Sequence, residues 1–106
     1  MKVFEKSRTA KIDEAMENLN MEVRSMVREA MQKGRIALIN RNIDGNLIID
    51  LFNEVLEILK KRGQLQPDPE FCSVDAHIAS INSLLNEVRA TRKKADDILK
   101  ACPKAI

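Results

Sequence analysis

The stretch LIIDLFNEVLEILKKR, residues 47–62, decides the fold of this chain of 106 residues. Nine of its sixteen residues are apolar, so only a narrow stripe remains for water, formed by Asp50, Glu54, Glu57 and Lys61. A helix that is apolar over most of its surface contacts neighbours on more than one side. Residues 47–62 therefore predict the central helix of a helical bundle.

The residues that flank this helix carry signals for its two ends. The turn at residues 40–46 is rich in Asn, Asp and Gly, which tolerate turn conformations. Asp44 or Asn46 offers the capping oxygen, and the basic residues 60–62 match the carboxyl end of the helix dipole. Gly63 then predicts the stop, so the helix is expected to end just before it.

A long amphipathic helix is predicted before the turn, from Ser7 to Lys33. Its apolar residues recur in steps of four and three, in the heptad pattern of a coiled coil: Ile12, Met16, Leu19, Val23, Met26 and Ala30. Gly34 offers a stop, but the apolar residues 36–39 fit the same helix. We expect the helix to continue through Gly34.

A linker is predicted after the central helix, at residues 63–72. Pro67 and Pro69 cannot both lie in a helix, because proline lacks the backbone donor and biases the preceding residue towards extended angles. Leu65 and Phe71 are the expected apolar anchors of this linker on the bundle.

A third helix is predicted from a Ser73 cap to a stop at Pro103. Its apolar residues again step by four and three: Val74, Ile78, Ile81, Leu85, Val88, Ala95, Leu99 and Cys102. Arg92 holds one position of this seam. Either its stem packs while its head reaches water, or it fixes the register by pairing with an acid across an interface.

The expected fold is a single all-α domain, residues 1–106, in which three helices form an antiparallel bundle. Two long heptad-patterned helices flank one shorter apolar helix, and dimerisation is one way of completing the bundle. An aromatic content of 3% leaves the core to aliphatic side chains and methionine, which suits interdigitating helices.

Charge and cysteine content restrict the class of protein. A net charge of +2 creates no strong basic field, and the charged amino terminus does not match a secretory signal. The longest uncharged run, residues 76–86, is too short to span a bilayer. Cys72 and Cys102 would stand ~45 Å apart along one helix, whereas a disulfide needs ~7 Å. We expect two reduced thiols and a cytoplasmic location.

The sequence offers no catalytic constellation, so we expect no enzyme, cofactor or small-molecule substrate. His77 is the only histidine and is expected to be partly exposed. The turn resembles the calcium loop of EF-hand proteins in Asn40, Asn42, Asp44 and Gly45. The bidentate Glu that calcium needs at position twelve of that loop is Leu51, so we expect a helix-connecting turn and no metal site.

Helix lengths point to a surface for a partner. The central helix is ~24 Å long and its predicted neighbours are ~35 to 44 Å long, so it cannot cover both of them. An apolar strip is then expected to remain on the two long helices, formed by Ile12, Met16, Leu19, Ile78, Ile81 and Leu85. Such a strip favours contact with a second protomer or another protein.

The sequence therefore favours a non-enzymatic protein–protein interaction module, an adaptor, small chaperone or assembly factor that self-associates through helix packing. The alternative is a small helical nucleic-acid binder that uses the basic cluster of the third helix, formed by Arg89, Arg92, Lys93 and Lys94. No aromatic side chains accompany this cluster to stack on bases, so the alternative ranks second.

Overall fold

The computed structural model describes residues 3–39, 44–65 and 73–101. They form three helices: α1 at Val3–Ile39, α2 at Gly45–Gln64 and α3 at Val74–Ala101. The prediction of an all-α fold of three packed helices is confirmed. The EF-hand-like residues Asn40 and Asn42, most of the linker and both cysteines lie outside the described residues.

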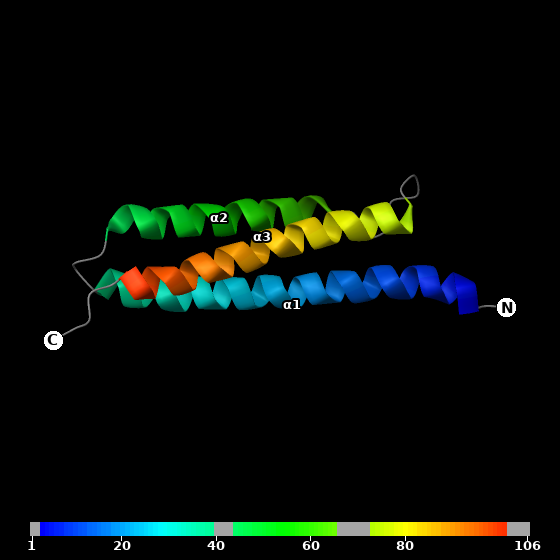
Figure 1. Ribbon diagram of the computed structural model, residues 1–106, viewed down its shortest axis with the longest axis horizontal. Coiled ribbons are helices and arrows are strands. Elements are labelled where there is room, and N and C mark those ends of the chain that lie inside the picture. The colour runs from blue at the N-terminus through cyan, green and yellow to red at the C-terminus, as the bar shows by residue number, and fades with distance from the viewer. Residues whose placement is uncertain (1–2, 40–43, 66–72, 102–106) are drawn as a thin grey trace.

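The three helices lie side by side in an elongated bundle (Figure 1). α1 and α3 run in the same direction and α2 runs in the opposite direction, as the colour gradient shows. Each helix contacts both of the others, and the contact between α1 and α3 is the most extensive. This arrangement brings α3 alongside the predicted seam of α1.

Two predicted N-caps are present. The Asp44 carboxylate accepts a hydrogen bond at 2.9 Å from the backbone N–H of Asn46, where α2 begins. The Ser73 hydroxyl accepts one at 3.0 Å from the backbone N–H of Ala76, where α3 begins. Each cap satisfies a backbone donor that the first turn of a helix leaves free.

The predicted stop at Gly63 is wrong, because α2 continues to Gln64. The backbone N–H of Leu65 then donates to the carbonyl of Arg62 at 3.2 Å and closes the helix. Glycine costs a helix only ~1 kcal/mol relative to alanine, which packing can outweigh. Leu65 is half-buried against the core, as expected of a linker anchor.

α1 is longer than predicted at its amino end, where it begins at Val3, and it continues through Gly34 as predicted. A core of buried side chains runs between the three helices, and its largest fully buried members are Ile12, Leu19, Met26, Leu51, Ile81 and Val88. At ~1.5 to 3 kcal/mol for each large apolar side chain, this burial supplies most of the driving force for folding.

Gly34 is buried where α1 meets α2. A Cβ atom added at Gly34 would stand 2.6 Å from Cζ of Phe52, at the end of the aromatic ring. The missing side chain therefore lets the ring lie directly on the α1 backbone, which explains why a glycine is tolerated inside this helix.

We expect Gly34→Ala to destabilise the chain by about 1–3 kcal/mol, because overpacking against Phe52 outweighs the gain in helix propensity. Gly63→Ala is the control, since its Cβ would meet nothing within 4 Å. That control should gain up to about 1 kcal/mol. Urea unfolding followed by circular dichroism measures both, and a Gly34→Ala chain as stable as the wild type would contradict the close contact.

Candidate functional site

The predicted partner strip lies between α1 and α3. Ile12, Leu19, Ile81 and Leu85 are buried, whereas Met16 and Ile78 are half-buried. The expectation that this strip stays uncovered is corrected: α3 runs alongside α1 and covers it. Whether these six residues also touch a partner stays a prediction, but most of them do not form an open surface.

An open apolar groove lies instead between α1 and α2. Its volume is about 540 Å³, and its lining residues are Val27, Met31, Arg35 and Leu38 of α1 and Phe52, Val55, Leu56 and Leu59 of α2. Several of these side chains are well exposed: Met31 by 56%, Leu38 by 64% and Leu56 by 63%. We call this surface the α1–α2 groove.

α2 contributes to the groove because it carries two apolar stripes. The first stripe is buried in the core and consists of Ile48, Leu51, Val55 and Ile58. The second stripe is shifted by one residue and consists of Ile49, Phe52, Leu56 and Leu59. Phe52 is half-buried, and the other three are exposed. One residue turns a helix by ~100°, so the second stripe lies to one side of the first, where Phe52 still packs against the core and the other three residues are exposed.

The exposed stripe could have been found in the sequence. Nine apolar residues among the sixteen at positions 47–62 exceed what one buried stripe uses, and they indicate contacts on more than one side. The apolar residues that α1 contributes to the groove were not recognisable in the same way. Met31 and Leu38 are adjacent in sequence to the residues of the buried heptad pattern and were expected to pack beside them.

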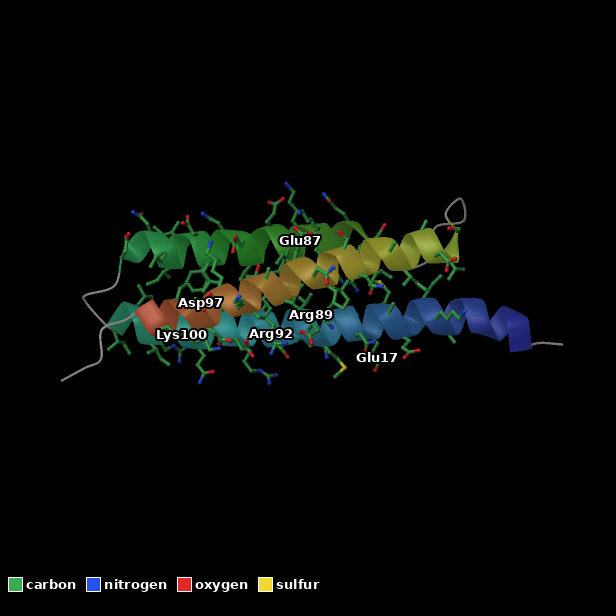
Figure 2. All side chains as sticks on the ribbon, viewed as in Figure 1. Glu17, Glu87, Arg89, Arg92, Asp97 and Lys100 are labelled. Carbon is green, nitrogen blue, oxygen red and sulfur yellow. The ribbon has the colours of Figure 1, made fainter. Side chains whose placement is uncertain are left out.

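Arg92 of α3 forms the central polar contact with α1 (Figure 2). Its guanidinium donates to the Glu29 carboxylate at 2.7 and 3.2 Å and to Glu22 at 2.5 Å. Two roles were considered for Arg92, and the structure shows the second, pairing with an acid across an interface. The interface is the contact between α1 and α3 within one chain.

These contacts shift the pKa of both partners. Hydrogen bonds from Arg92 lower the pKa of Glu29 below its ordinary value of 4.5, and partial burial opposes this effect. Hydrogen bonds to Glu29, and then to Glu22, raise the pKa of Arg92 above its ordinary value. Glu29 and Arg92 are therefore both charged near neutral pH. Lys33 adds to this network, because it pairs with Glu29 and with Asp96 of α3.

The predicted nucleic-acid cluster is divided by such pairs. Arg92 faces its two glutamates, and the Lys94 ammonium lies 3.3 Å from a carboxylate oxygen of Glu54 in α2. Arg89 and Lys93 are exposed, but the shallow hollow that they line with Arg92 also includes Glu29 and Asp96. The four cations thus do not form one free basic face, and binding of nucleic acid stays a prediction from the sequence.

His77 departs from the expectation of partial exposure, since only 5% of its surface is accessible. It lies in the first turn of α3, and its Nε2 has no hydrogen-bond partner. Among the described residues no group of three or more His, Cys, Asp or Glu side chains could hold a metal ion. His77 by itself therefore defines no site.

Comparison with known proteins adds no assignment. No family model, curated protein or solved structure matches the chain. Within the described residues, no helix combines the length and apolar character needed to cross a membrane. The groove and its surroundings therefore carry the functional argument.

The Arg92 contacts predict how stability changes with pH. Because the pKa of Glu29 is lower in the folded chain than in the unfolded one, its stabilising effect is present above pH 4.5 and is lost as the pH falls through the folded pKa. We expect Glu29→Gln to lower the free energy of unfolding by about 0.5–1.5 kcal/mol at neutral pH, and by much less in acid.

Urea unfolding of the wild type and of Glu29→Gln at a series of pH values tests this expectation. Glu17→Gln is the control, because Glu17 is exposed on α1 (Figure 2). The control should differ little from the wild type. A Glu29→Gln effect that is constant over the pH range would show that charge on Glu29 does not contribute.

Proposed function

We propose that this chain is a non-enzymatic protein–protein interaction module that acts through helix packing at the α1–α2 groove. The observation that carries the proposal is the exposure of large apolar side chains from two adjacent helices in one concave surface. Single exposed apolar residues are ordinary in soluble proteins, whereas a contiguous patch marks a binding surface.

The shape of the surface favours a helix as the bound element. On α1 the lining residues Val27, Met31, Arg35 and Leu38 follow each other by four, four and three positions, so they form one stripe. The exposed stripe of α2 lies beside it. Two helical stripes with a groove between them offer the packing geometry that an added helix completes in a four-helix bundle.

The surrounding contacts also support this choice of surface. Among the described residues, the ion pairs between helices join α3 to α1 or to α2. The margins of the α1–α3 and α2–α3 contacts are therefore occupied by charged side chains. The α1–α2 groove has an apolar floor with well-exposed side chains, so it offers the larger gain on burial, at ~25 cal/mol for each Å² of apolar surface.

The self-association expected from the sequence is tested at the same surface, because a second copy is one source of a helix for the groove. A module of this kind serves as an adaptor, a small chaperone or an assembly factor. Sedimentation of the purified chain over a range of concentrations measures whether a second copy binds there.

The double variant Met31→Gln with Leu56→Gln tests the groove. Both side chains are exposed, so the free energy of unfolding should change by less than ~0.5 kcal/mol for each substitution. We expect this variant to lose the capture of partners from cell extract, or self-association, while its circular dichroism stays that of the wild type.

Met21→Gln is the matched control, because Met21 is also exposed, by 59%, but does not line the groove. It should behave as the wild type. Equal capture by the wild type and by the groove variant would refute the proposed function.

A further inference from the structure

The margin of the α1–α2 groove carries positive charge. Arg35 is among the lining residues. Arg28 precedes it by seven residues, or about two turns, so the two arginines lie on the same side of α1. On α2, Lys60 follows the exposed Leu56 by one turn, and all three cations are exposed.

The acidic residues nearest in sequence face elsewhere. On α1, Glu22 and Glu29 point to α3, where they bind Arg92. On α2, Glu54 pairs with Lys94 of α3, and Glu57 lines a separate hollow between α2 and α3. These acids are therefore not placed to neutralise the cations at the groove margin.

Two further acids of α1 lie beyond the end of the groove. Asp13 and Glu17 precede Asn20, whose side-chain oxygen accepts a hydrogen bond at 2.6 Å from Arg62 in the last turn of α2. The groove lining begins only at Val27. Along residues 27–38 of α1, which line the groove, the charged side chains that do not pair towards α3 are the cations Arg28 and Arg35.

We infer that the α1–α2 groove takes an amphipathic helix of another protein that carries acidic side chains on both sides of its apolar stripe. This inference rests on the proposed function and specifies the partner. The lining of α1 spans twelve residues, with a rise of about 16 Å from the first to the last, so the contact involves about three turns of the bound helix. Apolar residues of that helix fill the groove, and its acids face the cations at the margin.

The same charges argue against a second copy as the occupant. A symmetric dimer brings the same face of both copies together, so the margins that meet would both be cationic. Like charges at such a contact repel each other, which favours a different protein with acidic flanks. An anionic membrane has the matching charge, but its surface cannot enter a groove between two helices as a single helix does.

Two labelled peptides of about 18 residues test the inference, since shorter isolated helices are only marginally stable. Both carry leucine at positions that form one apolar stripe, and they differ only in the flanking residues, glutamate in one peptide and lysine in the other. Fluorescence anisotropy measures their binding to the full chain. We expect the glutamate peptide to bind at least about tenfold more tightly, with the ratio falling towards one in about 0.5 M salt.

The double variant Arg28→Glu with Arg35→Glu should abolish or reverse this preference. The control is Arg89→Glu with Lys93→Glu on α3, which changes the net charge by the same amount away from the groove. The control should keep the preference of the wild type. Circular dichroism of both variants verifies that helix content is unchanged.

Several outcomes would overturn the inference. Equal binding of both peptides, lost in the Met31→Gln with Leu56→Gln variant, would leave the groove as a helix-binding site without selection for acids, so the proposed function would stand. Binding of neither peptide would refute a helix as the occupant. Tighter binding to phosphatidylserine vesicles than to either peptide would indicate a membrane as the partner. A second copy would be indicated by a dimer that persists in the Arg28→Glu with Arg35→Glu variant but dissociates in the Met31→Gln with Leu56→Gln variant.

Discussion

The contact of α3 along α1 is the interaction on which the rest of the structure depends. It buries apolar side chains of both helices over most of the length of α3, among them Leu19, Met26, Ile81 and Val88. Arg92 lies beside this seam and binds Glu22 and Glu29, two turns apart on α1. An arginine held by two acids has one satisfactory position, so the pair opposes sliding of one helix along the other.

With α3 placed on α1, α2 is left with more apolar surface than the bundle can bury. Its inner stripe completes the core, and the ring of Phe52 lies on the α1 backbone at Gly34. Its second stripe stays exposed beside Met31 and Leu38 of α1. The exposed groove is therefore a consequence of how three helices of this composition pack, and it lies opposite the face that α3 covers.

The three contacts between helices differ in the charged side chains that border them. Ion pairs of the described residues border the contacts that α3 makes, for example between Lys61 and Glu87 at 2.7 Å. Exposed pairs of this kind add little stability, but they supply water-facing margins. The α1–α2 groove combines an apolar floor with the exposed Arg28 and Arg35 of α1, which form no ion pair with another described residue, and this combination is the basis of the proposed partner.

The sequence by itself determined the helical class, the three elements and the two caps at Asp44 and Ser73, because periodicity and capping are local properties of the chain. It also determined that residues 47–62 are too apolar for one contact. Tertiary structure alone decided which stripe each helix buries: Ile12 and Leu19 were expected on an open face, but α3 covers them. The burial of His77 was missed for the same reason. An apolar pattern shows that a face avoids water, whereas the neighbour that covers it is set by the packing of the whole bundle.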